Sequence, residues 1–366
     1  MPPARPQVAT FLRWCQWLRL GVLADAAYTV VNIDETAIAR GMAPRRGHCV
    51  AKLGAAGRQR YARISLREAR GHMTYVAAIA DDPEVHRRLP QILLPHTERM
   101  TRADRQRLSA VAAPIVHMQG TKGWVTAEVF CDILTRLRRA CREVHPGRPV
   151  VLVMDCAPQH LSRQVLVHIA RLGLFVALVP ASMTWLLQPL DTHVFQHLKA
   201  AISSAQTTCR GESPGGVMPP GRWIDIAAAA IRQHVVDTDS AGRMKANGLR
   251  GPGDTLRPRI SEALGSALPL ALAPPSAEEF AELLGRAAPH MLELLLGPPR
   301  RYLRNRLDRA AAVAAGPVPV GRRLGPPLAR ARFGPAPGSS ASASGGAGAG
   351  EAEPPAPRRL RSGTMY

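Results

Sequence analysis

The sequence predicts an α/β fold in which a mixed central sheet is flanked by helices. Two observations carry this prediction. Apolar or β-branched runs of strand length recur along the first half of the chain, at 28–33, 73–80, 149–154 and 174–179. From residue 126 onward, strand-like runs alternate with segments of helical periodicity. That alternation is typical of a sheet covered by helices.

The individual elements follow from local patterns. A stripe of Phe11, Trp14, Leu18 and Val22 predicts a helix at 8–22, and the run from Tyr28 predicts a strand ending at Asp34. The continuously apolar run 149–154 predicts a strand buried on both faces. The remaining expected elements are strands at 61–66, 73–80, 89–94 and 174–179, a loop at 42–60, and helices at 126–143, 160–172, from Pro189, at 222–236 and at 276–296.

The charge balance favours a polyanionic partner. The 366 residues include 48 Lys and Arg against 27 Asp and Glu, giving a formal net charge of +21 and a pI near 11.2. Such a chain most often binds nucleic acid. Because Ala, Arg, Pro and Gly are abundant and Lys is scarce, coding bias is an open alternative explanation.

Other classes of protein are disfavoured. None of the six cysteines forms a C-x-x-C pair, so the sequence indicates neither a zinc ribbon nor a disulfide framework, and reduced thiols in an intracellular protein are expected. No apolar run is long enough to cross a bilayer, so no membrane association is expected. Arg13 and Arg19 interrupt the apolar N-terminal stretch, which therefore does not read as a secretory signal.

Three acids occupy comparable positions. Asp34 and Asp155 each follow a predicted strand, and Asp191 lies in the first turn of a predicted helix. Carboxylates at strand ends are where α/β folds place active sites, and Mg²⁺ prefers oxygen ligands. Two such ions can clamp the attacking and leaving oxygens of a phosphodiester. Each acid alone is more often a turn former or a helix cap.

Four motifs around these acids resemble a known family. Residues 32–36 read NIDET, 123–130 read GWVTAEVF, 151–160 read VLVMDCAPQH, and 178–191 read LVPASMTWLLQPLD. In this order they resemble the DDE superfamily endonucleases, the catalytic domains of pogo- and jerky-like transposases. The resemblance covers about residues 26–205, and Asp155 and Asp191 stand 36 residues apart, as suits the compact spacing of that group.

The resemblance implies an RNase H-like (retroviral integrase-like) fold and a metal-dependent nuclease and strand transferase. Asp34 would bridge two Mg²⁺ or Mn²⁺ ions, with Asp155 and Asp191 each binding one. DNA is the expected partner, a nuclear location is expected, and a homodimer is left open. His160, Lys199, Arg138 and Arg142 are the candidate DNA contacts. His160 could alternatively support a ligand of the metal, and an ordinary residue at a helix start is weighed about equally. The arginines could instead form a solvated face.

The expected organisation has four parts: a helical remnant at 1–25, the catalytic domain at 26–205, a helical extension at 206–316 and a disordered Pro/Gly/Ala/Arg-rich tail at 317–366. Two departures from the family favour a second hypothesis, a non-catalytic DNA-binding descendant. Cys156 stands where the family usually has Asn, and 33 residues before Asp34 leave no room for a pair of helix-turn-helix modules. His193 and His197, one helical turn apart, are a weaker candidate for a separate metal site.

Overall fold

The computed structural model describes residues 5–24, 26–41, 72–118, 123–251, 254–265, 271–284 and 289–314. The chain divides into Met1–Ala315 and Gly316–Tyr366, and every described residue belongs to the first unit. The predicted loop at 42–60, the predicted strand at 61–66 and the predicted disordered tail at 317–366 lie outside the described residues.

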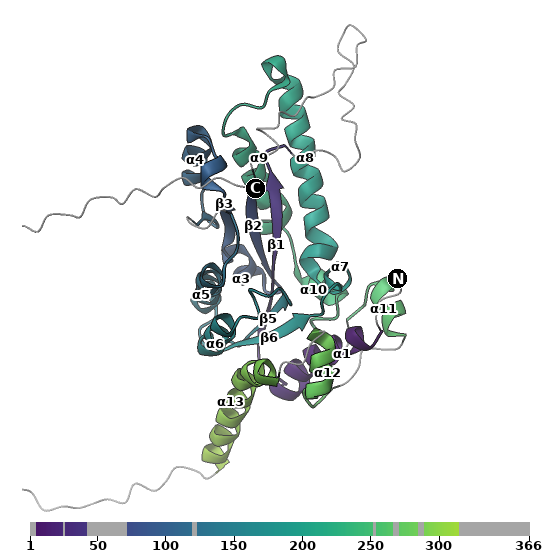
Figure 1. The fold of residues 1–366 in the computed structure, drawn as a ribbon. Helices are drawn as coiled ribbons and strands as arrows, with labels where there is room; N and C mark the ends of the chain where they lie inside the picture. The colour runs from purple at the N-terminus through teal and green to yellow at the C-terminus, as the bar shows by residue number, and fades with distance from the viewer. Residues whose placement is uncertain are drawn as a thin grey trace, which may run out of the picture. The chain divides into compact units, whose positions relative to one another are not determined.

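The described part of the chain is built around a six-stranded sheet with the order β4-β3-β2-β1-β5-β6 (Figure 1). The strands are β1 (Thr29–Ala39), β2 (His72–Ala80), β3 (Gln91–Pro95), β4 (Ile115–His117), β5 (Val150–Asp155) and β6 (Leu174–Val179). β1, β2 and β3 are antiparallel neighbours, β5 and β6 run parallel to β1, and β4 runs parallel to β3. This is the RNase H-like, mixed arrangement that the sequence predicts.

Helices surround the sheet and continue beyond it. They are α1 (Arg5–Gln16), η1 (Trp17–Val22), α3 (Pro83–Arg88), η2 (Thr97–Arg99), α4 (Arg102–Ser109), α5 (Ala127–Val144), α6 (Arg163–Leu172), α7 (Thr184–Leu187), η3 (Leu190–Val194), α8 (Phe195–Glu212), η4 (Pro214–Gly216), α9 (Arg222–Ile231), η5 (Arg232–Val236), α10 (Ala241–Ala246), α11 (Pro258–Leu264), α12 (Ala277–Leu284) and α13 (Pro289–Ala314). No helix in the described ranges is long and apolar enough to span a membrane.

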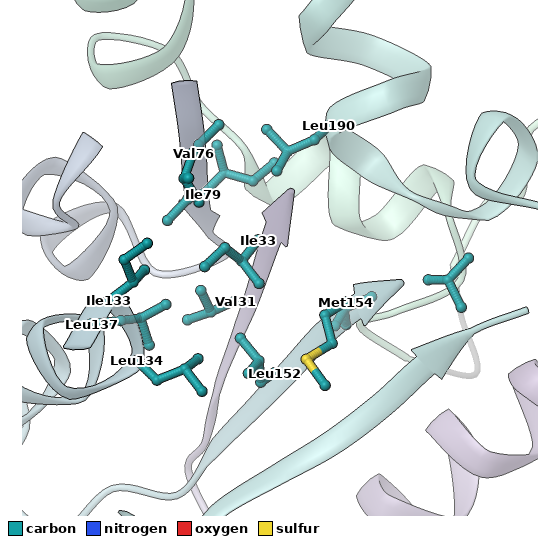
Figure 2. Packing of buried hydrophobic residues seen from close by; sticks show 14 of the residues in the cluster. Val31, Ile33, Val76, Ile79, Ile133, Leu134, Leu137, Leu152, Met154 and Leu190 are labelled. Atoms are coloured by element: carbon teal, nitrogen blue, oxygen red, sulfur yellow. The ribbon is translucent and has the colours of Figure 1, made fainter. Parts of the chain in front are cut away.

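Helix α5 covers one face of the sheet. It begins where the Thr126 side chain accepts a hydrogen bond from the Val129 amide, which satisfies one of the free amides of the first turn. Ile133, Leu134 and Leu137 then face Val31 of β1 and Leu152 of β5, as Figure 2 shows. All five side chains are buried, so this interface fixes the two strands that carry Asp34 and Asp155.

Strand β1 is longer than predicted. The predicted strand ends at Asp34, whereas β1 continues to Ala39 because it pairs with β2 as far as the Ala39–His72 partners. Its parallel pairing with β5 stops earlier, at Asn32 and Val153. Asp34 therefore lies inside a strand, just past the point where one of its two neighbouring ladders has ended.

The N-terminal helix packs against the C-terminal helices. Arg13 of α1 forms an ion pair with Glu279 of α12, and the Trp14 and Phe280 rings lie 5.3 Å apart between centroids. The segment predicted as one helix at 276–296 forms parts of α12 and α13, and Pro289, a favourable first-turn residue, begins the second. The predicted domain boundaries remain predictions.

Candidate active site

Asp34 and its neighbours in β1 point to opposite faces of the sheet. Successive residues of a strand alternate between faces. Asn32 shares the face of Asp34 and accepts a hydrogen bond from the Leu190 amide of η3, at 3.0 Å through Oδ1. Glu35, on the other face, is hydrogen-bonded to His160, whose ring stacks on Phe130 of α5. Asp34 thus faces the η3 side and Glu35 faces the α5 side.

Asp155 ends β5 beside Asp34. The parallel register pairs Asn32 with Val153, and extending it by two residues brings Asp34 level with Asp155. On its other side Asp155 pairs with Val179, the last residue of β6. The Asn32 side chain supports this corner because its Nδ2 donates to the Val153 carbonyl oxygen at 3.1 Å. The aspartates of β1 and β5 are therefore neighbours across adjacent strands.

Asp191 approaches from the helix side. It directly follows Leu190, whose amide is held by Asn32, and it lies in the first turn of η3. The Thr192 hydroxyl donates to the Gln188 carbonyl at 2.9 Å, which closes this turn. Asn32 therefore ties the strand of Asp34, the strand of Asp155 and the helix of Asp191 together. The sequence analysis assigned Asn32 no role, although it is the first residue of the NIDET motif.

The pKa of Asp34 is raised by burial and by two other acids. Burial is the largest effect on its carboxyl group and raises its pKa well above the ordinary value. The negative charges of Asp191 and Asp155 raise the pKa further, against a lowering contribution from the Glu35 amide, which donates to Asp34 Oδ1 at 2.7 Å. The charges of Asp155 and Asp191 therefore both act on the Asp34 carboxyl group.

Gln188 adds a polar group to the same place. It is fully buried, and its side chain acts on Asp34 to lower the pKa of that carboxyl group. Yet neither its Nε2 nor its Oε1 atom reaches hydrogen-bond geometry with a protein partner. The Gln188 amide therefore lies near Asp34 without a formed hydrogen bond. A buried amide with both ends unsatisfied is uncommon and suits a site that takes a ligand.

His160 bridges two carboxylates at the end of β5. Its Nδ1 lies 2.6 Å from Oδ1 of Asp155, and its Nε2 lies 3.0 Å from Oε1 of Glu35. Only 3% of the His160 side chain is exposed, and its ring stacks on Phe130 with centroids 4.0 Å apart. The bridge joins β1 to β5 beyond the end of their backbone ladder.

This bridge also sets the charge of its members. Burial alone would lower the pKa of His160, but the hydrogen bonds and charges of Asp155 and Glu35 raise it to about 9. Burial would raise the pKa of Asp155, but the bond and charge of His160 and the Ala157 amide outweigh it and lower that pKa. Asp155 therefore remains an ionised ligand.

The donor set fits a hard divalent cation in its chemistry. Burial and the charges of Asp191 and Asp155 disfavour a negative charge on Asp34, and a bound cation would relieve that cost. Within the described ranges, however, no group of three or more His, Cys, Asp or Glu side chains is arranged so that it could hold a metal ion. One oxygen of Asp155 is engaged by His160, which leaves its other oxygen to a metal.

Cys156 replaces the family's usual Asn without leaving a polar group unsatisfied. Its thiol donates to the carbonyl oxygen of Val179 at 3.0 Å, the last residue of β6. An Asn at this position could form a local hydrogen bond beside Asp155. A bond is present, and it links the ends of β5 and β6.

The four predicted DNA contacts differ in how exposed they are. Arg142 is exposed on α5 and Lys199 is half-buried on α8, with its ammonium 5.8 Å from the Phe195 ring centroid. Arg138 is buried and donates to the carbonyls of Leu172 and Arg148, so it serves packing and is a poor phosphate contact. His160 is likewise too buried to meet DNA directly. His160 instead contacts Asp155, as the alternative role expected of it requires. Arg138 was misjudged because its position in a helix does not reveal its partners.

His193 contacts Asn247 and does not form a pair with His197. Its Nε2 lies 3.0 Å from Oδ1 of Asn247, and burial is the main cause that lowers its pKa. His197 is exposed one turn further along the helix. The arrangement gives the alternative metal site at His193 and His197 no support.

Residues 74–210 match the family described as DDE superfamily endonuclease. The resemblance stated from the four motifs is thereby confirmed over a segment that contains Asp155, Asp191 and Lys199. The matched segment is less than half of the chain, and Asp34 lies before it. A search of curated proteins gives no match.

Several solved structures are similar to this one. They include "Mos1 transposase paired-end complex with left transposon end", at 16% identity and a TM-score of 0.41, with 73% of this chain and 63% of that chain covered. "Crystal structure of the Mos1 mariner paired end complex with Mn" is similar at 17% identity and a TM-score of 0.39, with coverages of 72% and 62%. The chain thus spans less than two thirds of these transposase chains. The fold assignment rests on the sheet order and register.

Proposed function

We propose that this protein is a transposase-derived, divalent-metal-dependent DNA endonuclease and strand transferase. The observation that carries the proposal is the placement of the three acids: the register brings Asp34 level with Asp155 on the adjacent strand, and Asp191 follows Leu190, whose amide donates to Asn32 of the same strand. The family match over 74–210 supports the same class of chemistry. We further propose a nuclear location, because DNA is the proposed substrate.

Asp34, Asp155 and Asp191 would hold two Mg²⁺ or Mn²⁺ ions. When bound, such ions supply Lewis-acid stabilisation of the attacking and leaving oxygens of a phosphodiester. In the first reaction water attacks phosphorus and the bond to the 3′ oxygen breaks, giving a 3′-hydroxyl and a 5′-phosphate. In the second, that 3′-hydroxyl attacks a target phosphodiester and displaces its 3′ oxygen.

The chain's own residues prepare the site for this chemistry. Asn32 holds two strands and a helix in register, and His160 fixes one oxygen of Asp155. Exposed cations such as Arg142, together with the net charge of +21, favour an approach by the DNA backbone. These groups therefore position ligands and substrate rather than react.

A second candidate function is non-catalytic DNA binding. The observation that favours it is Cys156, which replaces the usual polar neighbour of the second acid with a thiol committed to Val179. In that case the basic surface would be kept and the cleavage chemistry lost.

A cleavage assay separates the two functions. Supercoiled plasmid is incubated with wild type or with Asp155→Ala, in Mg²⁺, in Mn²⁺ and in chelator. The proposal predicts nicked or linear DNA only for wild type with metal, while both proteins bind DNA. If wild type and Asp155→Ala bind DNA alike and neither cuts, the non-catalytic function stands. If wild type shows no salt-dependent affinity for DNA, both functions fail.

A further inference from the structure

A short segment joins the end of β6 to η3, the helix that carries Asp191. It begins at Val179, which pairs with Asp155, and ends at Gln188, whose side chain acts on Asp34. Both ends of the segment therefore touch the catalytic edge. Between these ends, α7 packs against η3, the helix that carries Asp191.

Trp185 is the exposed aromatic residue of this segment. It is 46% exposed, whereas its neighbours Leu186 and Leu187 in α7 are fully buried. Its indole Nε1 donates to the Ser182 carbonyl at 2.9 Å. Ser182 has φ of 63°, the left-handed conformation that a non-glycine residue rarely adopts. The ring is thus held in place by a turn whose backbone is itself unusual, as at many functional sites.

The surroundings of Trp185 suit a flat ligand better than a protein partner. The other large apolar side chains exposed on the described ranges are Trp124, Val217, Leu272 and Leu307, none of which belongs to this segment. The other exposed residues along 180–188 are Ala181 and Ser182, which are small. A protein interface needs a contiguous apolar patch, whereas a nucleobase needs one aromatic plane.

We propose that Trp185 is a nucleobase-stacking subsite for an unpaired nucleotide of the DNA beside the scissile phosphate. The proposal rests on the proposed function, which brings DNA to the carboxylates that this segment spans. Base faces inside a duplex are hidden by their neighbours, so the stacked base must be unpaired, terminal or displaced from the helix. Stacking on an aromatic plane tolerates every base, and the subsite therefore carries little sequence preference.

The test compares two ligands and three variants in metal-free buffer. Fluorescence anisotropy measures binding of a labelled single-stranded oligothymidylate and of an abasic strand with the same number of phosphates. Trp185→Ala should weaken oligothymidylate binding about tenfold, and Trp185→Phe should restore most of the loss because a ring remains. Leu272→Ala, which removes a 76% exposed apolar side chain elsewhere, should bind as wild type does.

The abasic strand decides what is being contacted. Wild type and Trp185→Ala should bind it equally, because only phosphates and sugars remain. An equal loss on both ligands, or no loss on oligothymidylate, would overturn the subsite. Thermal unfolding of Trp185→Ala should match wild type, since the ring is half exposed. If wild type shows these affinities but does not cleave plasmid, the endonuclease proposal is rejected and the subsite stands. If wild type binds neither strand, both proposals are rejected.

Discussion

His160 Nδ1 lies 2.6 Å from Asp155 Oδ1, and the same imidazole reaches Glu35 across the boundary between β5 and β1. The ring is buried against Phe130, so it has little freedom to rotate. A hydrogen bond to one carboxylate oxygen orients the other. His160 is therefore a positioning residue, acting on a proposed metal through Asp155 rather than by touching the metal or DNA.

Removal of His160 should weaken metal binding without preventing cleavage. For His160→Ala we expect Mn²⁺ affinity, measured by calorimetry, to fall about 10- to 100-fold, the usual effect of losing a group that orients a ligand. Cleavage should recover at high Mn²⁺ concentration. His168→Ala is the matched control, because His168 bonds Thr135 away from the site. Equal Mn²⁺ affinity in His160→Ala and wild type would rule out the positioning role.

Two arginines of α5 should separate stability from DNA binding. Arg142→Gln removes an exposed cation, so stability should change by less than about 0.5 kcal/mol. If Arg142 meets a phosphate, the log–log salt slope of DNA affinity should become shallower by about 0.9. Arg138→Gln removes bonds to two carbonyls and should cost about 1.5–3 kcal/mol in urea unfolding with little change in the salt slope. The assignment is wrong if the two variants show the reverse pattern.

His86 should make stability depend on pH. Its Nδ1 accepts from the Ala80 amide at 3.1 Å and its Nε2 donates to the Val235 carbonyl at 2.7 Å, an arrangement that needs the neutral ring. Burial, the largest cause, lowers its pKa below 6.5 in the folded protein. As pH falls below about 6.5, the unfolded chain takes up a proton that the folded chain does not, so stability falls until the folded pKa is reached.

The matching measurement is urea unfolding at several pH values between about 7.5 and 5. Wild type should lose up to about 1.4 kcal/mol per pH unit from this group. His86→Gln should be less stable at neutral pH, yet it should lose less stability on acidification. Parallel pH profiles for the two proteins would show that His86 does not titrate as the structure indicates.

Much of the fold was predictable because local pattern and tertiary structure agree. The continuous apolar run before Asp155 became β5, and the periodic segment from Thr126 became α5. The end of β1 was misplaced because its apolar residues stop at Ile33 while its ladder with β2 continues to Ala39. Polar residues at the end of a strand do not show in the sequence that the strand continues, because the pairing that extends it depends on a strand far along the chain.

The acids of the site were predictable, and a supporting role for His160 was one of the predicted alternatives, but its partners were not. Motif resemblance located Asp34, Asp155 and Asp191, whereas the contact between His160 and Glu35 joins residues 125 positions apart. That contact exists only because β1 and β5 are neighbours in the sheet. Arg138 was mistaken for a surface cation because four arginines in a helix do not show which one faces the carbonyls at the end of α6.

The central claim is that three aspartates jointly hold catalytic cations, and anomalous diffraction from crystals soaked in Mn²⁺ tests it most directly. We expect two anomalous peaks about 3.5–4 Å apart, with Asp34 between them and Asp155 and Asp191 each bound to one. Asp155→Ala crystals should lose at least one peak. Peaks located away from these carboxylates, or an Asp191 carboxylate that binds neither ion, would contradict the claim.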